Sequence, residues 1–361
     1  MNLDVGSLQV LSTTEPDRWR ALLPAGQSAF GSLEFASIAE RHKRGIGRLI
    51  LFNSKEGHLL AAYPLILRTV SELPFVGCTS SEAWDAASPE YTGPLALEPC
   101  TEVVGRAFRR LFDQYCQDNR IVTEFAHLHP WRTAPGTCRP ENVHLDREII
   151  YVDLTQSEED LWRNSLTRAC RKNISRARSE KVRVFAAEKP DQICQFHQIY
   201  LHTMDRNQAQ TKYYYPLEFF MDFHERMSGN ARFVLAEHNG KIVAGTLFLH
   251  DDHDVFSYLG GAYHADQGVR PTNALIYETI RWARDEGKRR LILGGGYAPN
   301  DGIFRFKASF SPLRAGFSVY RQVHMPDRYG SLCAEWAVHH GADPQHDSFF
   351  PQYREIPENG R

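Results

Sequence analysis

Three consecutive glycines follow a short apolar run near residue 294. Gly294, Gly295 and Gly296 come directly after Leu291–Leu293, which favours a β-strand. A glycine-rich turn lets backbone N–H groups approach a ligand closely. The run therefore predicts either a strand end that opens to admit a substrate or an ordinary tight turn. No GK[ST] and no clear helix follow, so the Walker and Rossmann phosphate motifs are excluded.

A second segment, Asp301–Phe310, begins five residues after the glycines and interleaves aromatic with basic side chains. As a β-strand it would place Phe304 and Phe306 on one face and Arg305 and Lys307 on the other. This pattern suits a substrate-binding segment or an amphipathic strand with a solvated basic face. The adjoining glycines favour the substrate-binding interpretation, with Asp301, Phe304 and Arg305 among the contacting residues.

A strongly basic run lies near the middle of the chain. Eight basic residues and one acid, Glu180, occur between Arg163 and Arg183. Thr155–Glu158 and Ser157–Asp160 resemble capping boxes, so one helix is predicted from about 158 to 179. Basic side chains on one helix face attract phosphates without reading bases. The alternative is an ordinary charged helix. The candidate phosphate contacts are Arg168, Arg171, Lys172, Arg176 and Arg178.

Other polar segments carry weaker signals. Thr203–Asn207 and Tyr213–Tyr215 predict an irregular loop that suits a substrate lining or a surface turn. His250–Asp254 resembles a metal cluster, but its place between two β-rich runs favours a solvated hairpin turn. His127 and His129 would share one strand face, as a ligand pair or as packed residues. Arg44–Gly47 precedes a β-rich run, so it is interpreted as a helix end and not as a phosphate loop.

The elements that must position these residues show a weak internal repeat. Residues 48–67 and 232–249 each contain a β-rich run, a turn with glycine and a second β-rich run. Asn239-Gly240 is a strong hairpin signal. The first hairpin precedes a loop over 73–95, a helix near 102–117 and a strand over 121–126. The second precedes a strand over 254–259, a loop over 260–271, an amphipathic helix ending before Gly287, and a strand over 290–293. We interpret the repeat as one duplicated α/β unit.

Composition limits the class of protein. The 361 residues are 42% hydrophobic and 24% charged, with a formal net charge of −2, as in globular proteins with a substantial core. Any nucleic-acid contact must therefore use a local basic patch. The start has no signal-peptide pattern, and no run of apolar residues is long enough to span a membrane. Seven widely spaced cysteines suit a reducing cytoplasm and argue against a disulfide framework or a structural zinc site. No GxSxG or HExxH motif supports a hydrolase of those types.

Several segments together resemble the FemABX-like aminoacyltransferases and the related tandem-GNAT acyltransferases. The matching pieces are YVDLTQSEEDLW, RKNISRARSEKVRV, AGTLFLHDDHDVFSYLGGA, RPTNALIYETIRWARDEG, LILGGG and GIFRFKASF, with EYTGPL and TEFAHLHP as looser counterparts. The resemblance implies an α/β fold with two tandem GNAT-like domains, each a mixed, mainly antiparallel sheet flanked by helices. We expect domains over 1–150 and 151–321, with the active site in the second and the tail 322–361 returning to the first.

The resemblance also implies roles for individual residues. Lys307, with Phe306, matches a phenylalanine–lysine pair near the reacting ester, so we expect both to be catalytic. Arg206 resembles an acceptor-anchoring arginine. Substrate binding is further expected from the glycine run and from Tyr215, Tyr258 and Asn273. The [QR]-x-x-G-x-[GA] loop that binds acetyl-CoA is not intact. Pro271, in its place, has no N–H to offer a pyrophosphate.

The leading hypothesis is a transferase that passes an aminoacyl group from aminoacyl-tRNA to an amine, forming an amide, without a metal or redox cofactor. An acyl-CoA-dependent N-acyltransferase is the alternative. A non-catalytic RNA- or carbohydrate-binding protein on the same fold is the third hypothesis. The amine could belong to a natural product or to a peptidoglycan precursor. The amino acid, the acceptor and the oligomeric state are left open.

Overall fold

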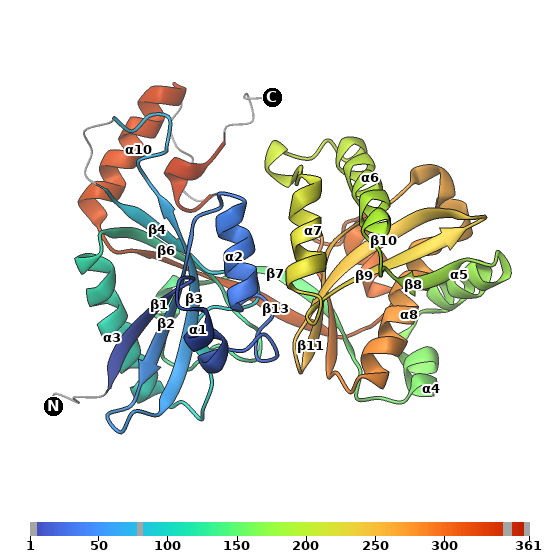
Figure 1. The fold of residues 1–361 in the computed structure, drawn as a ribbon, viewed down its shortest axis with the longest axis horizontal. Coiled ribbons are helices and arrows are strands. Elements are labelled where there is room, and N and C mark those ends of the chain that lie inside the picture. Colours follow the sequence, from blue (N-terminus) through green and yellow to red (C-terminus); the bar gives the residue numbers. More distant parts are fainter. Residues whose placement is uncertain (1–5, 78–81, 342–348, 357–361) are drawn as a thin grey trace. The chain divides into compact units, whose positions relative to one another are not determined.

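The computed structural model describes residues 6–77, 82–341 and 349–356 and divides into two compact units (Figure 1). Unit 1 comprises Met1–Pro24, Phe30–Asp146 and Phe317–Arg361. Unit 2 comprises Ala25–Ala29 and Arg147–Gly316. Cys78 lies outside the described residues; Cys100, Cys116, Cys138, Cys170, Cys194 and Cys333 are free thiols.

The described strands of unit 1 follow the order β1-β2-β3-β4-β6-β13. Neighbours are antiparallel except β4 and β6, which are parallel, and the short β5 pairs with β3. The strands are β1 (Ser7–Ser12), β2 (Ile46–Asn53), β3 (Leu59–Thr69), β4 (Trp84–Ala87), β5 (Leu95–Ala96), β6 (Ile121–His127) and β13 (Arg314–Val323). β4 lies inside the segment 73–95 that the sequence predicted to be a loop.

The described strands of unit 2 repeat this arrangement in the order β8-β9-β10-β11-β12-β7. Again one neighbouring pair, β11 and β12, is parallel and the others are antiparallel. The strands are β7 (Val143–Asp153), β8 (Arg183–Ala186), β9 (Ala231–His238), β10 (Lys241–His250), β11 (Asp254–Ala262) and β12 (Arg290–Gly294). The predicted hairpins, β2–β3 and β9–β10, hold equivalent places, and the predicted fold class is confirmed.

The sixth strand of each sheet follows, along the chain, a strand of the other unit. After β6 of unit 1 the chain continues into β7, whose residues 150–153 pair with β12 of unit 2. After β12 of unit 2 the chain reaches β13, whose residues 319–323 pair with β6 of unit 1. Each unit is therefore completed by the segment that follows the parallel pair of the other.

Helices cover both faces of each sheet because both faces are apolar. In unit 1, α3 (Glu102–Asp118) packs on one face, and α1 (Pro16–Leu22) and α2 (Leu33–Arg41) pack on the other. The C-terminal helix α10 (Pro326–His340) and the short turns η1 (Pro140–Asn142) and η5 (Gln352–Arg354) also belong to unit 1.

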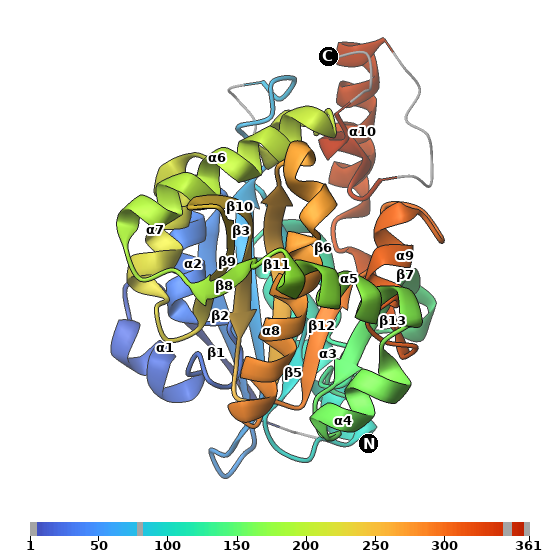
Figure 2. The same ribbon diagram turned by 90° about the vertical axis from the view of Figure 1, so that its right-hand side faces the viewer.

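In unit 2, α8 (Pro271–Asp285) and α5 (Arg168–Ser179) share one core with the sheet. Phe196 of α6 (Pro190–Arg206) and Phe220 of α7 (Leu217–Arg226) meet Phe233 of β9 on another part of the sheet. Figure 2 shows α5 lying across α8. The remaining elements are α4 (Glu158–Asp160), the π-helical turn η2 (Leu161–Ser165), η3 (Thr211–Tyr213), η4 (His264–Val269) and α9 (Gly302–Ala308).

The predicted continuous helix over 158–179 is wrong. Leu166 is extended with ψ 132°, which separates η2 from α5. Thr167 then caps α5 by accepting a hydrogen bond from the Cys170 N–H. The capping signal at Ser157 is confirmed, because its hydroxyl accepts from the Asp160 N–H. The predicted loop over Thr203–Asn207 is also wrong at its start, since α6 runs to Arg206.

Candidate functional site

The glycine run after β12 forms a tight turn whose shape is set by neighbouring protein atoms. Gly294 has φ +75°, a conformation that favours glycine. A Cβ on Gly295 would lie 2.7 Å from the Glu148 carbonyl oxygen, and one on Gly296 would lie 2.4 Å from the Asp301 carboxylate. The tight-turn interpretation therefore accounts for all three glycines, and their backbone packs against the chain itself.

The segment after the glycines is a helix, so the predicted strand over Asp301–Phe310 is wrong. Asp301 is the N-cap of α9, and its carboxylate accepts hydrogen bonds from the backbone N–H groups of Phe304, Tyr297 and Ala298 at 2.6–3.1 Å. These bonds, with the Phe304 N–H first, lower the pKa of Asp301. Sequence alternation missed the helix because the N-cap signal sits in a segment of only seven helical residues.

The helix changes which side chains share a face. Phe304 is buried, and Lys307, one turn later, is half-buried with its Nζ donating to the Gly295 carbonyl oxygen at 2.7 Å. Arg305 is exposed and donates to the Asn300 carbonyl oxygen at 2.6 Å. Phe306 is half-buried and meets Phe310 edge-on, 5.4 Å between ring centroids. The structure thus brings Lys307 to the glycine turn.

Arg206, Tyr215 and Tyr258 lie in a second group around β11 and α7. Arg206 is exposed at the end of α6 and donates to the Ala262 carbonyl oxygen of β11 at 3.2 Å. The Tyr215 ring stacks on Phe219 with centroids 4.3 Å apart. The Tyr258 ring meets Phe223, one helical turn further along α7, at 5.9 Å.

Asn273 lies elsewhere, in the first turn of α8, and is buried against α5. Its Nδ2 contacts the Cys170 Sγ at 3.8 Å, and its backbone N–H donates to the Arg270 carbonyl oxygen at 3.2 Å. Pro271 is also buried. The first turn of α8 is therefore partly buried through Pro271 and Asn273, while its N-cap residue Arg270 and the preceding Gly268 are exposed.

Two of the basic side chains of α5, Arg171 and Arg178, contact neighbouring groups of unit 2, although Arg178 is 52% exposed; the other three form a separate exposed group. The Arg171 guanidinium donates to the carbonyl oxygens of Trp162, Arg163 and Leu166, which the break after η2 leaves without helical partners. Arg178 lies over the rings of Tyr277 at 5.1 Å and Trp162 at 5.7 Å. These two arginines hold the local fold together, a role that the basic pattern did not predict.

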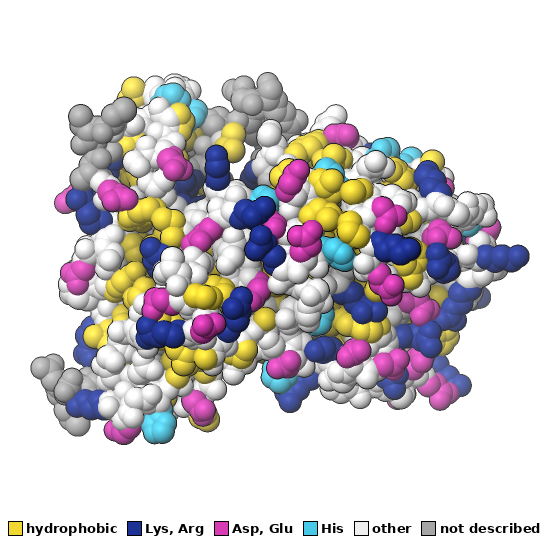
Figure 3. Space-filling view, in the orientation of Figure 1, with side chains coloured by type: hydrophobic (Ala, Val, Ile, Leu, Met, Phe, Trp, Pro, Cys, Tyr) yellow, Lys and Arg dark blue, Asp and Glu magenta, His cyan; other side chains and the backbone are white. Residues whose placement is uncertain are grey.

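The exposed group has a regular spacing. Arg168, Lys172 and Arg176 recur every four residues along α5, and all three are exposed. We call these three residues the basic stripe. Figure 3 shows Lys and Arg side chains gathered at the surface around α5, with acidic side chains between them. An exposed stripe of this kind can contact phosphates without reading bases.

The His250–Asp254 turn joins β10 to β11 as predicted, and Asp252 is exposed, but Asp251 and Asp254 are buried. The Asp251 carboxylate accepts from the backbone N–H groups of His253 and Asp254. Asp254 is buried and pairs with Arg290 at 2.7 and 3.0 Å. Asp251 and Asp254 can be buried because each carboxylate accepts hydrogen bonds from nearby donors. Within residues 6–77, 82–341 and 349–356, no three His, Cys, Asp or Glu side chains are placed to hold a metal ion.

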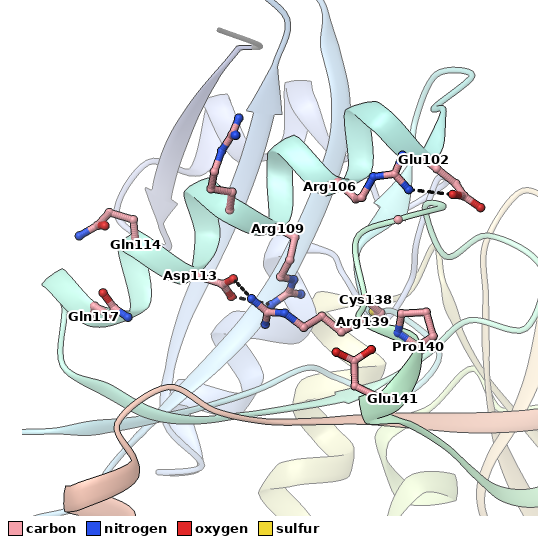
Figure 4. Close-up of a pocket in the computed structure, with 12 residues that line it drawn as sticks. Glu102, Arg106, Arg109, Asp113, Gln114, Gln117, Cys138, Arg139, Pro140 and Glu141 are labelled. Atoms are coloured by element: carbon pink, nitrogen blue, oxygen red, sulfur yellow. Dashed lines mark hydrogen bonds and ion pairs between the residues drawn. The ribbon is translucent and has the colours of Figure 1, made fainter. Parts of the chain in front are cut away.

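A groove of about 600 Å³ runs along α3 in unit 1, and none of the predicted site residues lines it (Figure 4). Its lining includes Arg106, paired with Glu102 at 2.8 Å, and Arg139, paired with Asp113 at 2.5 Å. Arg109 lies at its floor, where it pairs with the buried Glu124 at 2.6 and 3.0 Å. These charged side chains of the groove therefore already form ion pairs with one another.

Two tyrosines are exposed at the surface of unit 2: Tyr213, which belongs to the segment predicted as a substrate lining or surface turn, and Tyr297, which the sequence predictions omitted. Tyr297 directly follows the glycine turn and is 78% exposed; Tyr213, in η3, is 39% exposed. The only available sequence signal was an aromatic residue placed immediately after a glycine-rich turn.

Comparisons with known proteins show what this structure resembles. Residues 163–308 match the family model described as the acetyltransferase (GNAT) domain. The chain is similar to the crystal structure of FemX, with TM-score 0.69 and 11% identity over 90% of this chain and 99% of that one. No curated protein sequence matches.

Two further structures share the fold. The C-terminal domain of a putative lysylphosphatidylglycerol synthetase from Agrobacterium fabrum has TM-score 0.55 and 14% identity over 90% of this chain and 97% of that one. L-PGS from Bacillus licheniformis has TM-score 0.51 and 12% identity over 90% and 95%. The predicted resemblance is confirmed for the fold, and the GNAT match supports an acyltransferase. No helix in the described parts of the chain is both long and apolar enough to cross a membrane.

Proposed function

We propose that this protein transfers an aminoacyl group from an aminoacyl-tRNA to an amine acceptor and forms an amide. The observation that carries the proposal concerns the two sides of α5, one of which packs against α8 while the other exposes basic side chains. One side of this helix packs over the N-terminus of α8, where Asn273 meets Cys170, and its other side exposes the basic stripe. Pro271, the first residue of α8, has no N–H to offer a CoA pyrophosphate, and the stripe suits an RNA backbone.

The proposed reaction needs positioning and charge stabilisation. The amine nitrogen attacks the ester carbonyl carbon, a C–N bond forms, and the ester C–O bond to the ribose breaks. The nitrogen loses one proton and the departing ribose oxygen gains one. Negative charge develops on the carbonyl oxygen, where a fixed ammonium stabilises the transition state more than the ground state. We assign this role to Lys307, which the Gly295 carbonyl orients.

Other residues fit supporting roles in this proposal. Asp301 holds the turn between Gly296 and α9 through three backbone N–H groups, so it positions Lys307 instead of contacting substrate. Arg206 is exposed beside β11 and remains the candidate for anchoring an anionic acceptor. A natural-product amine and a peptidoglycan precursor both remain candidate acceptors.

An acyl-CoA-dependent N-acyltransferase is the second candidate, favoured by the GNAT family match over residues 163–308. The test is to incubate the protein separately with charged total tRNA and with acetyl-CoA, together with a cell extract as the source of amines, and to search for new amides by mass. New aminoacyl amides that require charged tRNA support the proposal. Acetyl amides formed only with acetyl-CoA would replace it with the second candidate.

A further inference from the structure

Residues 349–356, which we call the C-terminal segment, dock on unit 1 through two adjacent side chains. The Tyr353 side chain is 1% exposed, and its hydroxyl donates to the Asp85 carboxylate of β4. The Arg354 Nε donates to the same carboxylate, and its Nη2 donates to the Thr69 carbonyl oxygen of β3 at 2.7 Å. Asp85 is itself fully buried. A tyrosine and an arginine from one short segment therefore share a single buried carboxylate.

The corresponding carboxylate of unit 2 has its positive partner inside the sheet. Asp254 of β11 and Asp85 of β4 both lie in the first strand of the parallel pair of their unit. Asp254 lies opposite Arg290 of β12, which forms its ion pair at 2.7 Å. Asp85 lies opposite Thr123 of β6, whose hydroxyl donates at 2.7 Å but carries no charge. The positive charge that pairs with Asp85 comes instead from the C-terminal segment.

A second arginine lies next to the same carboxylate. Arg68 of β3 is directly opposite Asp85 in the antiparallel β3–β4 ladder, so the two side chains share one face of the sheet, with Cβ atoms about 5 Å apart. Arg354 nevertheless takes the ion pair, and the buried Nε of Arg68 has no hydrogen-bond acceptor among the residues that the structure describes. Burial and the nearby charge of Arg354 lower the pKa of Arg68 to about 10. Two guanidinium groups thus lie near one carboxylate.

We propose that the C-terminal segment is a releasable latch on unit 1 and that Asp85 exchanges Arg354 for Arg68 when the segment leaves. A buried carboxylate that loses its partner is strongly unfavourable, which would oppose release. Because Arg68 is already opposite Asp85, a change of its side-chain rotamer is enough to restore an ion pair. Release also separates Phe350 of the segment from the Phe125 ring of β6, 6.3 Å away in the docked state, and makes this part of the sheet accessible. The latch belongs to unit 1 alone and is independent of the proposed function.

Hydrogen exchange of the full wild-type chain tests the release. The backbone N–H groups of Arg354 and Glu355 donate to carbonyl oxygens within the segment, and that of Gln352 donates to the Tyr329 hydroxyl. If the latch releases, these N–H groups exchange at a rate that low urea concentrations do not change, whereas those of β4 and β6 exchange only with global unfolding. Arg354→Leu should speed their exchange roughly 10- to 150-fold and leave β4 and β6 protected. Exchange of the segment only with global unfolding would show that it is not a latch.

A double-variant cycle tests the exchange of partners, with the unfolding equilibrium constant measured in urea. Arg68→Leu alone should change this constant by less than roughly threefold, because Asp85 keeps Arg354. Arg68→Leu combined with Arg354→Leu leaves Asp85 without a guanidinium, so the constant should rise roughly tenfold beyond the product of the two single effects. Arg328→Leu is the matched control. Arg328 pairs with Glu335 on α10 at 2.9 Å, so its effect should simply multiply with that of Arg354→Leu.

The outcomes of the cycle are distinct. If the effects of Arg68→Leu and Arg354→Leu multiply as those of the control pair do, Arg68 does not replace Arg354 and the proposed exchange is wrong. If that double variant fails to fold while the control double variant folds, Asp85 depends on Arg68 once Arg354 is gone, as proposed. Thermal melting identifies the variants that fold.

Discussion

The two units share one strand order, but they differ in the side chains that are buried between the sheet and its helices. In unit 1, helix α3 places Arg109 against Glu124 of β6, and both side chains are at most 5% exposed. The Tyr63 hydroxyl donates to the same carboxylate at 2.9 Å, and His324 reaches it at 3.1 Å. In unit 2, helix α8 meets its sheet through aliphatic side chains. These include Leu275, Ile276, Ile280, Leu291 and Leu293.

The difference concerns how each unit receives its sixth strand. β13 enters unit 1 with polar contacts: Tyr320 lies under the Arg109 guanidinium at 4.8 Å, and Gln322 accepts from Arg139 at 2.9 Å. β7 enters unit 2 with Ile150 and Val152, both fully buried. Apolar contacts tolerate small shifts, whereas a buried charge that loses its partner is strongly unfavourable. The pairing of β13 with unit 1 therefore involves specific polar side chains beside its apolar contacts, whereas Ile150 and Val152 join β7 to the apolar core of unit 2.

The largest expected effect is the loss of the buried charge in unit 1. Glu124→Gln leaves the buried Arg109 guanidinium with only the more distant Asp113 carboxylate, at 3.4 Å, so the free energy of unfolding should fall by about 3–5 kcal/mol. In unit 2, Asp254→Asn removes the partner of Arg290, whose side chain is 19% exposed and can be hydrated. We expect a smaller loss there, about 1–3 kcal/mol. Urea unfolding measures both losses.

Arg106→Ala is the control for this comparison, because Arg106 lies on the same helix but its pair with Glu102 is exposed. It should change stability by less than about 1 kcal/mol. Hydrogen exchange should show β2, β3 and β6 becoming less protected in Glu124→Gln while β9 and β10 stay protected. Equal loss of protection in both units would contradict the distinction between them.

Substitution of Lys307 should have the next largest effect, and it tests whether the reaction takes place in unit 2. If the proposed function holds, Lys307→Ala should lower turnover about 10²–10³-fold, because one donor to the developing oxyanion is removed. Lys307→Arg should restore only part of the rate, since a planar guanidinium is not a point charge. Single-turnover amide formation measures the rates, and a thermal melt excludes misfolding.

Lys288 offers a matched control for that variant. Its Nζ donates to the Asp251 carbonyl oxygen at 2.7 Å, the same distance as in the Lys307 bond to Gly295, and it is also half-buried. Lys288→Ala should react at close to the wild-type rate. If both alanine variants lose activity equally, the effect is structural and Lys307 has no role in the reaction.

The pH dependence of stability should also separate the units. Burial raises the pKa of Glu124, but the charge and hydrogen bonds of Arg109 and the bond from His324 lower it more, to about 2. An unfolded glutamate titrates near pH 4.3, so this carboxylate contributes roughly 3 kcal/mol above that pH. The contribution is lost as the pH falls from about 4.3 toward 2. Melting temperatures across this range should fall less steeply in Glu124→Gln than in the wild type; parallel curves would refute the assignment.

The smallest expected effect concerns RNA binding by the basic stripe. Lys172→Glu and Arg176→Glu together should weaken tRNA binding about tenfold and reduce the salt slope by nearly one for each lost phosphate contact. Arg106→Glu with Arg110→Glu, on the exposed side of α3 in unit 1, should leave both quantities unchanged. Filter-binding titrations at several salt concentrations test this. Arg171 and Arg178 are unsuitable for this test because they support the fold.

The sequence predicted the regular parts of both units. The hairpins β2–β3 and β9–β10, helix α3 and the apolar face of α8 followed from periodicity and from turn residues such as Asn239-Gly240. Gly287, with φ +71°, ends the segment after α8 as predicted. These features are local, so neighbouring residues alone specify them. The helix α9 was difficult to predict from local sequence, because an alternation of Phe with basic residues fits a β-strand as well as one short helix.

The tertiary structure decided what depends on distant partners. It placed β13 in unit 1 and β7 in unit 2, although each follows a strand of the other unit. It tied Arg171 to backbone carbonyls and left Lys172 exposed, although the two are adjacent in one basic run. It also set Lys307 at the Gly295 carbonyl oxygen. Periodicity assigns a side chain to a face, but its role depends on which groups fold against that face. The positions of the charged residues along the chain were therefore known from the sequence. The role of each charged side chain depended on the groups that surround it in the tertiary structure.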